Sequence, residues 1–400
     1  MLTKIKEISE SDDVSIIALV DALLEHATTF RASDIHLDPL ERGMRVRLRI
    51  DGVLQDLLTI PKNIQSEIVS RIKVLSGLRT DEHQSAQDGR LRYLPEGAGA
   101  VDVRVSITPT YFGENAVLRL LTDKAEEFSL QNLGFTPIAA AKLARAIGKP
   151  YGMILSTGPT GSGKTTTLYT IIKKLNTPEV SIVTIEDPIE YAIAGIKQIQ
   201  VNVGSGLTFS SGLRSILRQD PNVIMVGEIR DAETASIAVN TALTGHLLLS
   251  TLHTTDAATT LPRLLDMGVE AFLVASTVNM VIGQRLVRRI CETCKKERAI
   301  HDDEAVLLSQ VMPKEKILTK VFAGTGCEAC SGSGYRGRLS VSEMLEVDTA
   351  VREAILKRSS ARELRRVAIE AGMTPMFEDG LAKMVAGQTT ISELFRVMYE

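Results

Sequence analysis

The stretch 153–170, MILSTGPTGSGKTTTLYT, constrains the fold most, because an apolar run leads into a glycine-rich turn and then into a helix. Its centre, GPTGSGKT, matches the phosphate-binding pattern G-x-x-x-x-G-K-[ST] at every fixed position. Glycines let backbone N–H groups curl around a β-phosphate, the lysine neutralises phosphate oxygens, and the next hydroxyl ligates Mg²⁺. The pattern predicts an ATP site made of the following residues: Gly158, Pro159, Thr160, Gly161, Ser162, Gly163, Lys164, Thr165 and Thr166.

Largely apolar runs alternate with helical patterns from residue 151 to about 285. GMILST, SIVTIED, NVIMVGE and HLLLSTLH each suit a strand of a parallel sheet that helices cover on both faces. The fold class predicted for this region is therefore α/β.

The flanking regions have different patterns. Residues 13–30 repeat apolar positions at helical spacing, and short alternating runs such as VDVRVSI and NAVLRLL follow, which predicts a small α+β domain. Capping boxes are expected at Ser360/Glu363 and Thr390/Glu393. We expect five segments: an N-terminal α+β domain at 1–122, a linker at 123–135, the α/β core at 136–285, a subdomain with two cysteine pairs at 286–340, and C-terminal helices at 341–400.

Carboxylates follow two of the apolar runs. VIMVGEIRD (223–231) ends its strand at Glu228, and we expect this strand beside the phosphate-loop strand, where Glu228 and Thr165 could hold Mg²⁺ or Glu228 could polarise the attacking water. VTIEDPIEY (183–191) adds Glu186, Asp187 and Glu190 at another strand end. Any one of these alone could be a solvated strand end, but together with the phosphate loop they indicate hydrolysis.

Two histidines flank the run LLLSTL. His246 and His253 are an odd number of positions apart, so simple strand alternation puts them on opposite faces and in separate sites. Each could instead lie at a strand end and sense the γ-phosphate, or could be a structural hydrogen-bonding group.

The cysteines form the pattern C-x2-C…C-x2-C, with CETC and CEAC as its two halves. Two turns that each offer two thiolates favour a closed, structural Zn²⁺ site with the ligands Cys291, Cys294, Cys327 and Cys330. Free thiols, a redox pair and an iron–sulfur cluster are the alternatives. The long gap between the pairs predicts a helical insertion at DDEAVLLSQVM.

Composition excludes several classes of protein. The formal net charge is -3, which gives no general attraction to nucleic acid or acidic membranes. No apolar run approaches the ~18 residues of a membrane-spanning helix, and the N-terminus lacks the apolar region of a secretory signal. The cysteine region 286–340 is only weakly basic and has only Phe322 and Tyr335 as aromatics, too few for a nucleic-acid stacking platform. We expect a cytoplasmic protein with no nucleic-acid partner and no direct membrane insertion.

Taken together, these motifs resemble the secretion ATPase superfamily, which drives type II secretion and type IV pilus assembly and includes pilus retraction motors. The resemblance runs from about residue 13 to the C-terminus. It depends on motifs in one order: ASDIHLDP (32–39), GPTGSGKT, TIEDPIEY, LRQDPNVIMVGEIRD (217–231), TGHLLLSTLHTTDA and the two cysteine pairs.

The resemblance implies a RecA-like motor domain and gives roles to several residues. TIEDPIEY looks like the family's Asp box, with Glu190 as its carboxylate, and Glu228 looks like the catalytic glutamate of an atypical Walker B motif. His246 and His253 look like the His-box pair. The implied phosphate-binding arginines are Arg104 and Arg119 from the N-terminal domain, Arg214 and Arg218 from a core helix, and Arg338. An arginine that arrives only on domain closure couples hydrolysis to motion.

The resemblance further implies a homo-hexameric ATPase at the inner face of the cytoplasmic membrane, with ATP, Mg²⁺ and structural Zn²⁺ as cofactors. Closure would push an inner-membrane platform protein to extrude pilin-like subunits. The four cysteines favour secretion or pilus assembly, because retraction motors generally lack them. The alternatives are a pilus retraction or DNA-uptake motor, and a non-hydrolytic nucleotide switch or zinc-dependent nucleic-acid binder.

One expectation concerns the N-terminus. Members of this branch usually carry a further domain that docks on a membrane partner, whereas the first expected helix here begins near residue 13. We therefore expect that domain to be absent from this chain, either by truncation or because the member is naturally short.

Overall fold

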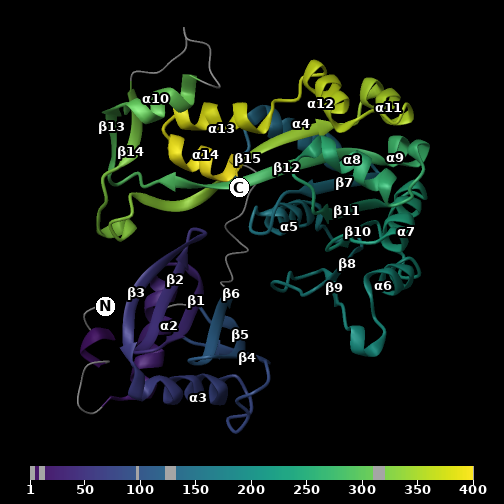
Figure 1. Ribbon diagram of the computed structural model, residues 1–400. Coiled ribbons are helices and arrows are strands. Elements are labelled where there is room, and N and C mark those ends of the chain that lie inside the picture. The colour runs from purple at the N-terminus through teal and green to yellow at the C-terminus, as the bar shows by residue number, and fades with distance from the viewer. Residues whose placement is uncertain (1–4, 9–13, 96–98, 122–131, 310–319, 400) are drawn as a thin grey trace. The chain divides into compact units, whose positions relative to one another are not determined.

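The computed structural model describes residues 5–8, 14–95, 99–121, 132–309 and 320–399. The chain divides into two compact units, residues 1–126 and 127–400 (Figure 1). The expected linker at 123–135 lies outside the described residues up to residue 131.

The first unit is a six-stranded antiparallel sheet packed on helices, with strand order β3-β2-β1-β6-β5-β4. Its strands alternate buried and outward residues; along β5, for example, Val103 and Val105 are buried while Arg104 between them faces outward. The buried residues join those of the helices in one core. The elements are α2 (Ile16–Thr29), β1 (Ala32–Leu40), β2 (Gly43–Ile50), β3 (Val53–Pro61), α3 (Gln65–Leu75), β4 (Gln87–Tyr93), β5 (Val101–Thr110) and β6 (Gly113–Leu121).

The second unit is built on a seven-stranded sheet in the order β15-β12-β7-β11-β10-β8-β9. Neighbouring strands from β12 to β9 are parallel, and β15 is antiparallel to β12. The strands are β7 (Gly152–Thr157), β8 (Ile182–Glu186), β9 (Lys197–Gln200), β10 (Val223–Val226), β11 (Leu247–Leu252), β12 (Val278–Ile290) and β15 (Tyr335–Glu346).

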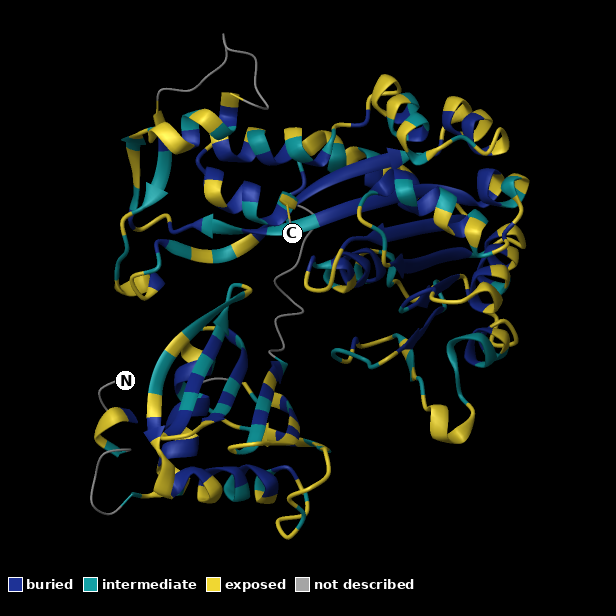
Figure 2. Cartoon of the chain, in the orientation of Figure 1, coloured by how far each residue is buried: buried dark blue, intermediate teal, exposed yellow. Residues whose placement is uncertain are grey.

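Helices cover both faces of this sheet, as the continuously apolar strands predict. Along β7, Met153 and Leu155 belong to the apolar cluster on one face and Ile154 to the cluster on the other. Figure 2 shows these strands as the most buried part of the unit. One face carries α4 (Pro137–Ile147) and α5 (Lys164–Leu175); the other carries α6 (Phe209–Ile216), α7 (Ala232–Leu243), α8 (Ala257–Asp266), α9 (Ala271–Thr277), α11 (Thr349–Leu356) and α12 (Ala361–Glu370).

Strands β12 and β15 continue together past the rest of the sheet to the small hairpin β13 (Lys295–Ala299)–β14 (Lys320–Gly324) (Figure 1). The helical insertion expected between the cysteine pairs forms as α10 (Asp302–Ser309), and α13 (Met376–Val385) and α14 (Ile391–Tyr399) pack along the two long strands. The expected segment boundaries at 285/286 and 340/341 fall inside β12 and β15. The cysteine region is therefore an extension of the core sheet.

Across the described ranges, none of the helices is both long enough and apolar enough to cross a membrane.

Candidate nucleotide site and cysteine cluster

The phosphate-loop pattern occupies the turn between β7 and α5, as the sequence predicts. β7 is buried throughout and ends at Thr157, and α5 begins at Lys164 after Gly163, whose φ is +87°. A Cβ on Gly158 would lie 2.4 Å from the backbone oxygen of Gln284, so only glycine fits there. Thr165, the expected Mg²⁺ ligand, is exposed in the first turn of α5.

Lys164 turns back over the start of the loop. Its Nζ donates to the carbonyl oxygens of Gly158 at 2.8 Å and Pro159 at 2.9 Å. Burial lowers the pKa of Lys164, and the charge of Glu228 opposes that shift. Lys164 and Glu228 are therefore close enough to interact, which brings the two halves of the expected site together.

Glu228 follows β10 at the edge of the sheet where β7 also ends. Its Oε2 lies 3.0 Å from Nε2 of His253 and 2.6 Å from Nε of Arg230. The prediction that the Glu228 strand lies beside the phosphate-loop strand is wrong: β11 lies between β10 and β7 and brings His253 from its own end.

The two histidines lie at opposite ends of β11. His253 follows the strand, whereas His246 precedes it and its Nδ1 lies 3.1 Å from the carbonyl of Thr241. They are seven positions apart along the strand, which is about 23 Å. Within one chain only His253 joins the Glu228 site.

Glu186, at the end of β8, is the centre of a buried polar cluster. The Tyr169 hydroxyl of α5 donates to its carboxylate, and Gln198 Nε2 donates to it at 3.2 Å. Burial raises the pKa of Tyr169, and the carboxylate beside it raises it further. The same hydroxyl accepts from the Glu190 backbone N–H at 3.4 Å. The cluster thus ties the phosphate-loop helix to the acidic segment that carries Glu190.

In the first unit, Arg104 and Arg119 lie directly opposite each other on β5 and β6. Arg90 on β4 is opposite Arg104 on its other side, so three arginines form one row across three strands. Arg119 Nε donates to Asp34 Oδ1 at 2.9 Å. Like charges opposite one another destabilise a sheet, and the Asp34 carboxylate offsets part of this repulsion at Arg119. Arg90 was missed by the sequence analysis, although strand pairing could have revealed it.

The other three expected arginines are dispersed in the second unit. Arg214, on α6, pairs with Glu233 at 2.8 Å, and Arg218 lies beyond the helix end at Ile216 and donates to the Arg214 carbonyl. Arg338 is exposed on β15, opposite Arg288. It lies four residues along the strand from the position opposite Gln284, roughly 13 Å.

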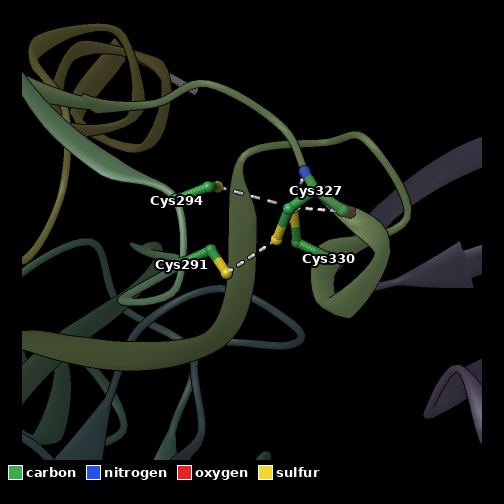
Figure 3. A group of neighbouring side chains, drawn as sticks. All are labelled: Cys291, Cys294, Cys327 and Cys330. Carbon is green, nitrogen blue, oxygen red and sulfur yellow. Dashed lines mark hydrogen bonds between the residues drawn. The ribbon is translucent and has the colours of Figure 1, made fainter.

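The four cysteines form one cluster, with all sulfurs within 4.8 Å of one another (Figure 3). Sulfur–sulfur distances are 3.8 Å for Cys291–Cys327, 3.8 Å for Cys294–Cys330 and 3.7 Å for Cys327–Cys330. Four sulfurs 2.3 Å from a tetrahedral ion would be about 3.8 Å apart. A disulfide needs about 2.05 Å, so the arrangement fits a metal site.

The backbone around Cys330 favours its thiolate. Burial opposes ionisation, but the N–H groups of Cys327 and Gly334 donate to the sulfur at 3.2 and 3.3 Å and lower the pKa of Cys330 to about 6. A thiolate is the form that binds metal.

Residues 9–396 match the sequence profile of the family described as type II/IV secretion system protein. The chain belongs to that family. The type IV pilus assembly ATPase PilB of Myxococcus xanthus is 46% identical over 96% of this chain and 68% of its own length. The type II secretion system protein E of Aeromonas hydrophila is 45% identical over 97% of this chain and 77% of its own length.

Among solved structures, the pilus retraction motor PilT with bound ADP matches with a TM-score of 0.63 at 26% identity, covering 94% of this chain and 96% of that chain. This match confirms the α/β ATPase fold. Together, the family and its relatives confirm the resemblance seen in the sequence and the prediction of an ATP-hydrolysing enzyme.

Proposed function

We propose that the chain hydrolyses ATP to drive the assembly of pilin-like subunits, either in type IV pilus biogenesis or in type II secretion. The relatives named for these processes are about 45% identical to the chain, whereas the retraction motor PilT is 26% identical. The difference favours assembly or secretion over retraction. The working form we propose is a homo-hexamer on the cytoplasmic side of the inner membrane, acting on a membrane-embedded platform protein.

The hydrolytic chemistry is carried by one observation: the Glu228 carboxylate bonds to His253, and its charge opposes the burial that lowers the pKa of Lys164. The phosphate loop binds the β-phosphate through its backbone, and Lys164 neutralises the β and γ oxygens. Thr165 and Glu228 are the groups that would hold Mg²⁺, which supplies further positive charge at the phosphates. Glu228 orients the attacking water, and His253 fixes the position of the Glu228 carboxylate.

Arg104 and Arg119 are proposed to supply further positive charge to the phosphates. Their support is their position in one row with Arg90 on β4, β5 and β6, which gathers three positive charges on one face of the sheet. We also propose the roles that the family resemblance implies for the remaining site residues, which are Glu190, His246, Arg214, Arg218 and Arg338.

We also propose that the four cysteines hold a structural Zn²⁺. The sulfur spacing fits tetrahedral coordination, and four protein ligands leave no open position for catalysis.

The decisive experiment is steady-state ATPase turnover combined with native mass spectrometry. Glu228→Gln should keep the hexamer and ATP binding but lower kcat roughly 1,000-fold, because it removes the carboxylate that orients water. Arg104→Ala should lower kcat with the ring intact. Phosphate release that persists unchanged in Glu228→Gln would refute the catalytic assignment.

In the cell, a deletion strain that gains pili instead of losing them would indicate retraction.

A further inference from the structure

Gln284 is buried against the phosphate loop, although nothing in the local sequence marks it. Its side chain lies on β12 and is 1% exposed. Nε2 donates to the Ser162 carbonyl at 2.7 Å, and Oε1 accepts from the hydroxyl of Thr167 at 2.9 Å and of Ser156 at 3.4 Å. One amide therefore bonds to the strand, the loop and the helix of the phosphate-binding unit.

The amide can adopt only one orientation at this place. Nε2 faces a carbonyl, which can only accept, and Oε1 faces hydroxyl groups, which can donate. Reversing the amide would place its oxygen against the Ser162 oxygen and leave a buried acceptor without a donor, which is costly. The same hydrogen bonds that position the loop therefore also fix the orientation of the Gln284 side chain.

The bond to Ser162 determines where the next N–H points. In a trans peptide the C=O and N–H groups of one unit point in opposite directions. With the Ser162 carbonyl held toward Gln284, the N–H of Gly163 points away from Gln284. Gly163 has no side chain to restrain it, and its φ is +87°, a region that glycine enters freely.

We propose that Gln284 is a positioning residue of the nucleotide site, which fixes the Ser162–Gly163 peptide so that the Gly163 N–H donates to the β-phosphate. This inference rests on the proposed ATPase function. It assigns Gln284 to diphosphate recognition, a step that ATP, ADP and pyrophosphate share, and not to the γ-phosphate chemistry at Glu228.

The test is nucleotide binding to the full chain carrying Gln284→Met, which keeps the side-chain length and removes both polar atoms. The dissociation constants of ATP, ADP and pyrophosphate should each rise about tenfold, the effect of one lost hydrogen bond to a charged group. Thr167→Val, which removes the shorter of the two hydrogen bonds to the amide oxygen, should shift all three constants in the same direction by a smaller factor. The double variant should lose less than the product of the two factors, because both act through one amide.

Matched controls separate positioning from general stability. Thr170→Val removes a hydroxyl that donates within the same helix, to the Thr166 carbonyl, and Gln65→Leu removes a buried amide from the first unit. All measurements are made at a temperature at which circular dichroism shows every variant folded. A purely structural role would lower the melting temperature and leave the three constants unchanged, which would overturn the inference.

Lys164→Ala distinguishes failure of this inference from failure of the proposed function. If Lys164→Ala abolishes binding while Gln284→Met and Thr167→Val do not weaken it, the role of Gln284 is refuted and the nucleotide site stands. If Lys164→Ala leaves binding intact, the proposed site itself is wrong. A loss confined to ATP in Gln284→Met would place the residue at the γ-phosphate and also overturn the inference.

Discussion

Single residues of the site differ in how far the sequence could reveal them. Lys164 and Thr165 belong to a local motif whose strand and helix are also readable, so their positions were predictable. The strand end at Glu228 was predictable too, but not its distance from β7, because β11 lies between the two strands. Gln284 was not, because its partners Ser162 and Thr167 lie more than a hundred residues away along the chain. Only strand order, which non-local packing decides, brings them together.

The histidine pair provides a prediction at this scale. His253→Ala should lower kcat roughly 100-fold with little change in the affinity for ATP, because the Glu228 carboxylate loses the group that orients it. His246→Ala should have a much smaller effect, since His246 bonds to a helix carbonyl at the other end of β11. Single-turnover kinetics on both variants would measure the difference. Equal losses would mean that His246 also reaches a nucleotide.

At the scale of helices and strands, periodicity predicted the parallel strands well and the caps only in part. Ser360 and Thr390 each accept from the backbone N–H three residues on. The expected return bonds from Glu363 and Glu393 are replaced by ion pairs with arginines. β1 escaped prediction because ASDIHLDPL alternates poorly, with a bulge between Ala32 and Asp34. A bulge shifts the two-residue period on which strand prediction depends.

Glu393 ties α14 to β12 and makes this contact sensitive to acid. Burial alone would raise its pKa, but hydrogen bonds from Arg396 and Arg288 outweigh burial and lower the pKa from 4.5 to about 2. A lowered pKa stabilises the fold above pH 4.5, and this stabilisation is lost as the pH falls toward 2.

Glu393→Gln should therefore destabilise the second unit by about 3 kcal/mol at neutral pH, because it removes the carboxylate that offsets the charges of two partly buried arginines. Urea denaturation at several pH values would measure this. The difference between the variant and the parent should shrink as the pH falls below 4.5. A difference that stays constant down to pH 2 would exclude Glu393 as the titrating group.

At the scale of the whole molecule, the sequence predicted five segments, among them a separate N-terminal α+β domain and an α/β core. Two of the predicted boundaries, at 285/286 and 340/341, fall inside strands β12 and β15. The boundary at 285/286 was predicted because the first cysteine, Cys291, follows soon afterwards. The structure instead continues β12 from Val278 to Ile290 and pairs it with β15 over most of that length. A change in composition along the chain does not reveal that one strand, here β12, runs from the core sheet into the cysteine region.

Removal of the proposed metal tests how far the cysteine region contributes to the stability of the core sheet. A chelator should raise hydrogen exchange in β13, β14 and the outer part of β15, because thiolates close together need a cation. Exchange in β8, β10 and β11 should stay unchanged, since those strands are buried under helices on both sides. Hydrogen-exchange mass spectrometry would resolve the two groups of peptides. Loss of protection throughout the sheet would show that the metal stabilises the whole unit.

The course of β12 has a mechanical consequence. A β-strand is close to the full extension of the chain, so a force applied at one end is transmitted to the other end with little change in length. Cys291 directly follows the end of β12 at Ile290 and is seven positions from Gln284, about 23 Å of extended backbone. A force applied near the cysteines would therefore act along β12 on Gln284 and, through its hydrogen bond to Ser162, on the phosphate loop.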